Sequence, residues 1–403
     1  MSVATQNVVA TLRDVGGDLA TSRGVVPEKT ADGLLWRVPP GEAFSLRLPL
    51  TAEGQSHFAV SATVCVSNWD ELVRVDLEAD SGSKTYRTGA KHLIQGRWHE
   101  LRLDSSSLAF GIANGWSPAL PAIDTVSLHV LGTAAAETTF ALRDLTVEVF
   151  DASDAVPRLL VDDELESLDD ILSWYPAITG RSSDPVLQDY VFVREYKTLD
   201  ADAVRLAEAM RSRSEYELRS VTTPVKVGPD GEPEGTPSAS WRFGWQSLDM
   251  CFALVRAFKA TRDHGYLMLA IDHVDSWLAA NIGNEPVDDY YGWYDHGVAL
   301  RALAMLTVVD VAIEERVDAE RVAPLIRAIR DHSELLANES FNGFNQSQHF
   351  HNHTLFQAVS LLFVARNQLG FAESQRWSAV AEQRILDQLN GLLSSEGVAI
   401  ENS

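Results

Sequence analysis

The sequence predicts a multidomain protein: an N-terminal antiparallel β-sandwich of jelly-roll type, followed by an all-α (α/α) toroid, complete or incomplete. Three observations predict this. The chain has 403 residues, which is too long for one ordinary hydrophobic core. Apolar residues alternate with a period of two from about residue 33 to residue 150, and the period changes to 3.6 from residue 201 onward. We therefore expect a sandwich in residues 1–150, a linker in residues 151–200 and a toroid in residues 201–403.

The predicted strands are short alternating runs separated by Gly, Pro, Asp and Ser. They read FSLRLPL, HFAVSATVCVS, LVRVDLEAD, WHELRLD, TVSLHVLG and TFALRDLTVEVF. Runs of this kind are typical of an antiparallel sandwich, in which alternate residues face the core. The stretch from GRWHELRLD to DLTVEVF resembles jelly-roll modules of the carbohydrate-binding or galactose-binding type. Sandwiches of this shape also serve as structural spacers.

Acidic clusters, VDDELESLDD and SSDPVLQDY, mark the predicted linker. The helical period then predicts helices at about residues 202–213, 245–262, 266–280, 295–315, 319–338, 354–369 and 373–393. The Gly- and Pro-rich stretch KVGPDGEPEGTPSAS between the first two is a predicted loop. Short connections pair the helices as hairpins, and the lack of a strict sequence repeat favours a toroid over a regular solenoid.

The charge balance limits the partners of the protein. Lys and Arg total 33 against 57 acidic residues, which gives a net charge of −24. This field repels nucleic acid and anionic membranes, so neither is an expected partner. An acidic polysaccharide would need a local cleft rich in basic or amide groups. Cys65 and Cys251 are the only cysteines and are expected to be reduced, buried thiols.

The N-terminus lacks a basic segment followed by an apolar one, so no secretory signal is expected. No apolar run approaches transmembrane length, and the longest lies around residues 361–365. These features predict a cytoplasmic protein, or a secreted or periplasmic one if a leader has been removed. No cofactor is predicted, and the sequence does not predict an oligomeric state.

Three segments rich in aromatic and amide residues precede predicted helices: SWRFGWQ, DDYYGWYDHG and FNGFNQSQHFHNHT. In a toroid, alternate helices start at the same rim, so these segments could line one cleft. Flat aromatic faces suit sugar rings, and amide or imidazole donors suit hydroxyls and carboxylates. The alternative is that the aromatic side chains pack between helices. The expected substrate-binding residues are Trp241, Trp245, Tyr291, Trp293, Tyr294, His296, Arg301, His349 and His351.

Arg301 lies among leucines of a predicted helix. A guanidinium at such a position is either paired with a buried acid or reaches a ligand carboxylate. We favour the first alternative, a structural ion pair with a buried acid.

The HFHNHT segment, residues 349–354, raises the question of a metal site. If it is extended, His349, His351 and His353 share one face and could bind zinc. No HExxH motif or Cys-rich partner lies nearby, and three adjacent histidines are rarely all ligands. We therefore predict no metal there. The alternative is that Asn352 caps the helix that follows, whose free N–H groups and partial positive charge also favour a bound carboxylate.

At these residues the chain resembles the heparinase II/III-like polysaccharide lyases, over roughly residues 190–403. The segment SASWRFGWQSLDMCFALVRAFKATRDHGYLMLAIDHVDSWLAAN resembles a helix pair of that family, and WYDHGVALRAL resembles the next helix, with its Arg at Arg301. HNHTLFQAVSLL resembles the Asn-His catalytic segment, and SSEGVAIENS resembles the end of the toroid.

The resemblance implies an (α/α) toroid that cleaves uronate-containing chains by β-elimination. In this mechanism the carboxylate next to the poorly acidic C5 proton must be neutralised before a base removes the proton. If the family's roles are carried over to this sequence, Asn352 neutralises the uronate carboxylate and His353 is a hydrogen-bond donor or acid/base helper beside it. His296 and Arg301 become subsite or scaffold residues. A Tyr supplies the proton to the leaving oxygen.

The family's Tyr and its large β-sheet domain follow the point at which this chain stops, Ser403. Truncation is the favoured explanation, so little lyase activity is expected from these residues alone. Otherwise another tyrosine serves, such as Tyr290, Tyr291 or Tyr294, or the protein is not a lyase. The alternatives are a non-catalytic glycan-binding protein and a surface-polysaccharide (capsule or exopolysaccharide) biosynthesis protein of the same fold. A glycoside hydrolase using carboxylates such as Asp288, Asp289 and Asp295 is a weaker one.

Overall fold

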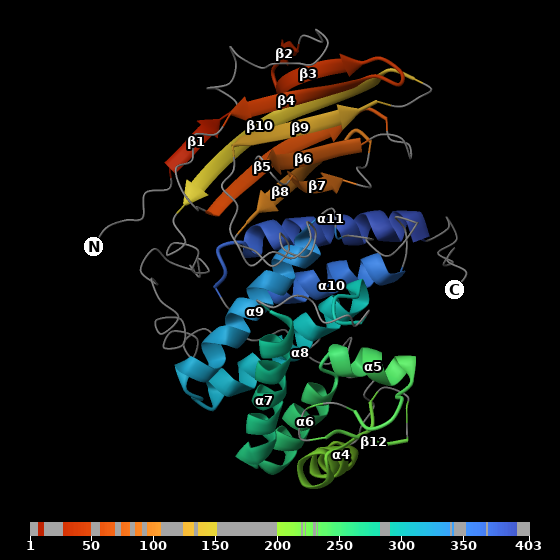
Figure 1. Cartoon of the computed structure of the whole chain (residues 1–403), viewed down its shortest axis with the longest axis vertical. Coiled ribbons are helices and arrows are strands. Elements are labelled where there is room, and N and C mark those ends of the chain that lie inside the picture. The colour runs from red at the N-terminus through yellow and green to blue at the C-terminus, as the bar shows by residue number, and fades with distance from the viewer. Residues whose placement is uncertain are drawn as a thin grey trace. The chain divides into compact units, whose positions relative to one another are not determined.

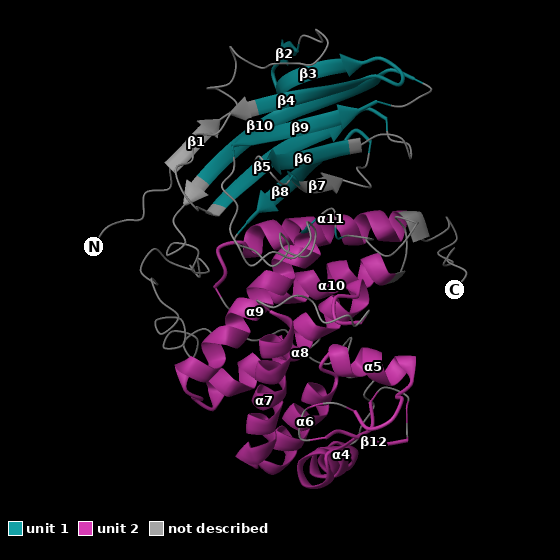
Figure 2. Ribbon diagram, viewed as in Figure 1, with its two compact units in different colours: residues 1–156, 338–344 teal, residues 157–337, 345–403 magenta. Residues whose placement is uncertain are grey.

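The computed structural model describes much of the chain, and every structural statement below concerns these residues. They are residues 7–11, 27–49, 57–68, 74–80, 85–90, 95–105, 124–132, 136–150, 200–218, 221, 223–228, 231, 233–282, 291–338, 341, 352–367 and 370–392. The chain divides into two compact units (Figure 2), one of residues 1–156 and 338–344 and the other of residues 157–337 and 345–403. The predicted linker of residues 151–200 lies outside the described residues except for Asp200.

The first unit is built from two antiparallel sheets, as predicted (Figure 1). One sheet has the order β2-β3-β10-β5-β8, with β1 paired to β10, and the other has the order β4-β9-β6-β7. The strands are β1 (Asn7–Thr11), β2 (Glu28–Thr30), β3 (Gly33–Val38), β4 (Ala43–Pro49), β5 (His57–Val66), β6 (Arg74–Asp80), β7 (Thr85–Ala90), β8 (Trp98–Asp104), β9 (Thr125–Leu131) and β10 (Thr138–Phe150).

Alternation along the strands places the core of this unit between its sheets. In β5 every second residue from Phe58 to Val66 is buried. Three rings join the sheets: Trp36 of β3 stacks on Phe44 of β4 at 5.4 Å between centroids, and Phe140 of β10 lies 5.6 Å from Phe44. Aromatic and aliphatic burial on both inner faces is what holds a two-sheet sandwich together.

The second unit is helical. Its helices are α4 (Asp200–Arg213), α5 (Ala239–Gln246), α6 (Met250–Thr261), α7 (His264–Asn281), α8 (Asp295–Glu314), α9 (Ala319–Ala337), α10 (Asn352–Arg366) and α11 (Ser374–Leu392), with a small hairpin of β11 (Glu215–Tyr216) and β12 (Val225–Lys226). Consecutive helices pack as the hairpins α6/α7, α8/α9 and α10/α11, and α8 packs between α6 and α10. This is a two-layered (α/α) arrangement, with α6, α8 and α10 in one layer.

One predicted helix is two helices. The prediction of a single helix over residues 245–262, with the aromatic residues ahead of it, was wrong: those residues lie in α5, and α6 starts at Met250. The backbone between them turns at Leu248, which has a φ of +58°. A left-handed residue ends a helix because its carbonyl no longer points along the helix axis. Ser238 caps α5 by accepting from the backbone N–H of Trp241.

Helix α8 is apolar on almost every side. Among the described residues it is the one helix long and apolar enough to cross a membrane, with a mean hydropathy of 1.6, and 83% of that window is buried in this structure. A helix that is hydrophobic all round fits the centre of a helical unit. The length and composition of α8 therefore contradict the expectation that no apolar run approaches transmembrane length.

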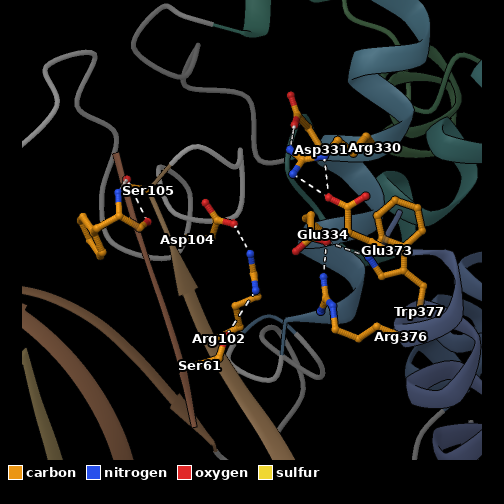
Figure 3. Close-up of polar contacts among 11 residues, drawn as sticks. Ser61, Arg102, Asp104, Ser105, Arg330, Asp331, Glu334, Glu373, Arg376 and Trp377 are labelled. Carbon is orange, nitrogen blue, oxygen red and sulfur yellow. Dashed lines mark hydrogen bonds and ion pairs between the residues drawn. The ribbon is translucent and has the colours of Figure 1, made fainter. Parts of the chain in front are cut away.

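Charged side chains join α9 to α11 (Figure 3). Arg376 and the indole N–H of Trp377 both donate to Glu334 of α9, and Arg330 of α9 donates to Glu373, the residue before α11, at 2.7 Å. In the first unit, shown in the same figure, Arg102 donates to Asp104 Oδ2 at 2.8 Å. These pairs satisfy charged groups that packing removes from water.

Candidate active site

The candidate site is a cluster of polar and aromatic side chains where α8 and α10 begin, which we call the Asp295 cluster. Its members are Asp295, Tyr294, His296, His353 and Gln357. Asp295 is the first residue of α8 and is completely buried. Its Oδ1 accepts the backbone N–H of His296 at 2.6 Å. A carboxylate at this position is stabilised by the free N–H groups and the partial positive charge of the helix start.

Two side chains from α10 reach the same carboxylate. His353 Nδ1 lies 3.3 Å from Asp295 Oδ1, and Gln357 Nε2 donates to Asp295 Oδ2 at 3.2 Å. They share one face of α10 because they are four residues apart. Since Asp295 Oδ1 accepts here, the His353 proton lies on Nδ1 and the lone pair lies on Nε2. The His353 side chain is 19% exposed, so this imidazole is not sealed from solvent.

Tyr294 brings a phenol to this pair. Its Oη lies 3.5 Å from His353 Nδ1, and the two rings are 5.7 Å apart with nearly perpendicular planes. His296 packs 5.0 Å from His353 and 4.4 Å from Phe356. The cluster therefore combines a carboxylate-oriented imidazole, a second imidazole and a phenol, which are groups that can act as general acids or bases.

Phe243 of α5 supports the cluster from the side. Its ring lies within 6.1 Å of three rings, those of Tyr291, Tyr294 and His296. The next residue back, Arg242, is exposed and holds its guanidinium 5.4 Å from the Tyr291 ring centroid. This is a cation–π distance, so one cation stands beside the aromatic side of the cluster.

Trp241 and Trp245 do not belong to the cluster. Their rings stack on each other at 5.3 Å, Trp241 is completely buried, and its indole N–H donates to the carbonyl of Tyr216 at 2.9 Å. The expectation that Trp241 binds substrate was therefore wrong, because no face of the ring reaches solvent. Trp245 packs edge-on against Tyr216 at 5.1 Å and His273 at 5.8 Å, so the packing alternative holds for this pair.

Burial changes the titration of the groups around Trp245. It raises the pKa of Tyr216 to about 12 and lowers the pKa of His273 to about 4. The Tyr216 hydroxyl lies 3.1 Å from His273 Nε2. Both shifts favour the neutral forms, so this pair is neutral at physiological pH.

Arg301 takes neither of the two roles that its position among leucines predicted. It is completely buried, and its guanidinium donates to two backbone carbonyls, Gln246 O at 2.6 Å and Gly292 O at 2.8 Å, and to His332 Nε2 at 2.9 Å. Its charge lies 3.7 Å from the centroid of the Trp277 ring. The prediction of a buried acid as its partner was wrong: carbonyl dipoles and an indole face take that place.

Several predicted site residues fall outside what the structure describes. His349, His351, Tyr290, Asp288 and Asp289 lie in the gaps. Asn352 begins α10, and its side chain is also outside the described set. Its predicted roles as a helix cap and neutraliser stay predictions. Within the described ranges, no group of three or more His, Cys, Asp or Glu side chains could hold a metal ion.

Asp295 was not predicted as the partner of His353, and Gln357 was not predicted as a member of the site. Asp295 was considered only as a hydrolase acid, a role that its complete burial does not suit. The four-residue spacing of His353 and Gln357 on a predicted helix was the available signal.

Comparisons with known proteins gave structural neighbours only. No protein-family model matches the chain, and no curated protein matches it. The heparan sulfate lyase HepC from Pedobacter heparinus is 14% identical with a TM-score of 0.48, covering 58% of this chain and 36% of that one. A heparinase III structure is 13% identical with a TM-score of 0.43, covering 60% and 39%. The present chain therefore spans well under half the length of these two lyases.

A smaller neighbour covers 32% of this chain. TmCBM61, solved in complex with β-1,4-galactotriose, is 13% identical with a TM-score of 0.23, and 88% of its chain is covered.

Proposed function

We propose that this protein is a polysaccharide lyase that cleaves a uronate-containing glycan by β-elimination at the Asp295 cluster. One observation carries the proposal: Asp295 orients His353, with the Tyr294 hydroxyl 3.5 Å from the same imidazole, where the helix with the Asn-His segment begins. The resemblance of HNHTLFQAVSLL to the catalytic segment of heparinase II/III-like lyases supports it. Arg242 and the aromatic rings beside it suit a charged sugar chain.

The proposed reaction assigns one proton transfer to each side chain. His353 Nε2 takes the C5 proton, the C5–H electrons form the C4–C5 double bond, and the C4–O bond breaks. Tyr294 donates its phenolic proton to the leaving oxygen. His353 then releases its Nε2 proton to solvent, to which its side chain is 19% exposed, and the Tyr294 phenolate takes up a proton from solvent, which restores both groups with the His353 proton on Nδ1. Asn352 stabilises the charge that builds on the uronate carboxyl group.

Tyr294 is one of the three tyrosines within the chain that the sequence offered as a proton donor. The Tyr294 hydroxyl lies 3.5 Å from His353 Nδ1, which favours Tyr294 as the donor. Tyr291 packs against the Tyr294 ring, with 6.2 Å between the ring centroids. Tyr294→Phe keeps the ring packing and removes the acidic hydroxyl, so elimination should fall at least about 100-fold. Unchanged turnover would remove Tyr294 from the reaction and leave the donor to a residue elsewhere.

The proposal is tested by incubating the protein with a panel of uronate-containing glycans and following the ultraviolet absorbance of the unsaturated uronate. We expect an absorbing product from at least one acidic glycan, and none from neutral glycans. Asn352→Ala should abolish elimination, with glycan affinity reduced by less than about tenfold, since neutralisation matters most in the transition state.

His264→Ala is the control for the Tyr294→Phe and Asn352→Ala variants. His264 also begins a helix, α7, and faces a carboxylate, Glu315, at 3.5 Å, but it belongs to a different helix start. This variant should keep wild-type turnover. Tight binding of acidic glycans without any unsaturated product would overturn the lyase proposal and indicate a glycan-binding protein.

A further inference from the structure

We propose that Arg301 is the positioning residue of the Asp295 cluster, because it fixes the short segment that carries Tyr294. We call residues 291–294, which directly precede α8, the rim segment. The inference deepens the proposed function, since it concerns how the same site is held in its active geometry.

Arg301 is tied to the rim segment by a hydrogen bond to its backbone. One guanidinium nitrogen donates to Gly292 O at 2.8 Å, and the ring of Trp293 lies 5.3 Å from the guanidinium carbon. Arg301 sits almost two turns into α8, so its side chain reaches back past the helix start. The segment is thereby held from its interior side, while Tyr294 at its end faces His353.

The same guanidinium joins three other elements to the rim segment. It donates to Gln246 O at the end of α5, and its Nε donates to His332 Nε2 of α9. Its flat face lies on Trp277 of α7. A planar group with several fixed donors can hold these elements in one geometry, and a flexible ammonium cannot reproduce that pattern.

His332 completes the arrangement as an acceptor. Its Nδ1 lies 2.7 Å from Ala328 O, a carbonyl that can only accept, so Nδ1 carries the proton and Nε2 accepts from Arg301. Burial lowers the pKa of His332 well below its ordinary value, and the Arg301 charge lowers it further. His332 is therefore neutral, as this acceptor role requires.

The test uses Arg301→Lys, which keeps a cation but loses the planar donors. We expect amide hydrogen exchange in the rim segment to become at least about tenfold faster, because its backbone anchor is lost. Turnover of an acidic glycan should fall at least about tenfold with KM changed less than about threefold, since Tyr294 is misplaced for proton transfer rather than lost from binding.

Arg384→Lys is the matched control. Arg384 of α11 is also buried and also donates to two backbone carbonyls, Leu336 O at 2.6 Å and Ala337 O at 2.9 Å, at the end of α9. It should lose comparable stability in urea unfolding, with exchange in the rim segment and turnover unchanged. A general loss of stability would instead raise rim exchange equally in both variants, and that result would overturn the inference.

A second variant covers the case in which Arg301→Lys fails to fold. His332→Phe keeps the ring packing and removes the acceptor of Arg301 Nε, so rim exchange should rise by a smaller factor. Rim exchange at the wild-type rate in His332→Phe, or in a folded Arg301→Lys, would also overturn the inference. The exchange measurements need no substrate: if the wild type yields no unsaturated product, the proposed function fails while this positioning role is still decided.

Discussion

At the residue scale, the chemistry of His353 depends on one carboxylate from another helix. Asp295 lies 3.3 Å from Nδ1 and is buried at the start of α8, so it fixes the tautomer of the imidazole. Asp295→Asn removes the charge that stabilises the protonated imidazole during proton transfer. We expect kcat to fall about 10³-fold or more with little change in KM, measured as initial rates of unsaturated product.

The control for this prediction is Asp310→Asn on the same helix. Asp310 accepts from Asn367 Nδ2 at 3.3 Å and lies about four turns further along α8. Its variant should keep kcat within about twofold of wild type. If Asp295→Asn keeps kcat within the same limit while remaining folded, Asp295 does not support the chemistry of His353.

Some residues of the cluster could be predicted from the sequence and others could not. His353 and Tyr294 were found because they stand in segments rich in groups that bind sugars. Asp295 and His353 are 58 positions apart in sequence, and periodicity predicts which face a residue occupies but not its partner. The burial of Trp241 was missed for the same reason. The sequence around an aromatic residue near a helix start does not show whether its ring packs between helices or binds a ligand.

At the element scale, the pair α9/α11 depends on a buried carboxylate. Glu334 accepts from both Arg376 and Trp377, and its side chain is 5% exposed. Glu334→Ala leaves a guanidinium and an indole N–H without their acceptor. We expect the free energy of unfolding to fall by about 3 kcal/mol, measured by urea denaturation.

An exposed pair between α10 and α11 gives the comparison. Arg366 and Glu382, of α10 and α11, are 3.1 Å apart with side chains 52% and 50% exposed. Because solvent screens such a pair, Glu382→Ala should change the free energy of unfolding by less than about 1 kcal/mol. Equal effects of the two substitutions would show that burial does not set the strength of the α9/α11 contact.

The elements themselves were predicted where one face is buried. The strands β4, β5, β6, β8, β9 and β10 alternate apolar and polar residues and were found, whereas β1, β2, β3 and β7 were missed. β7 reads TYRTGA and β1 reads NVVAT, and both lie at the margins of their sheets, where pairing is set by a neighbouring strand. The break between α5 and α6 was missed because Leu248 is a good helix former, so its residue type does not predict the left-handed backbone that it has here.

At the scale of the whole molecule, acid acts on stability through two opposing effects. The chain carries a net charge of −24 at neutral pH, so protonating carboxylates relieves repulsion in the folded state. Buried neutral histidines act in the other direction. His273 has a pKa lowered to about 4 by burial, against about 6.5 in an unfolded chain. The unfolded state therefore takes up the proton first, and stability is lost as pH falls from about 6.5 towards about 4.

Replacing His273 separates the two effects. Wild type and His273→Phe share the carboxylates and His332, so the difference between their unfolding free energies isolates the titration of His273. Between about pH 7 and about pH 4.5, wild type should lose about 2–3 kcal/mol relative to the variant. Removing the hydrogen bond with Tyr216 lowers the variant's stability at every pH, so only the change with pH is diagnostic. Urea unfolding followed by tryptophan fluorescence at constant ionic strength measures this change, and parallel pH profiles for the two proteins would contradict a neutral His273 with a lowered pKa.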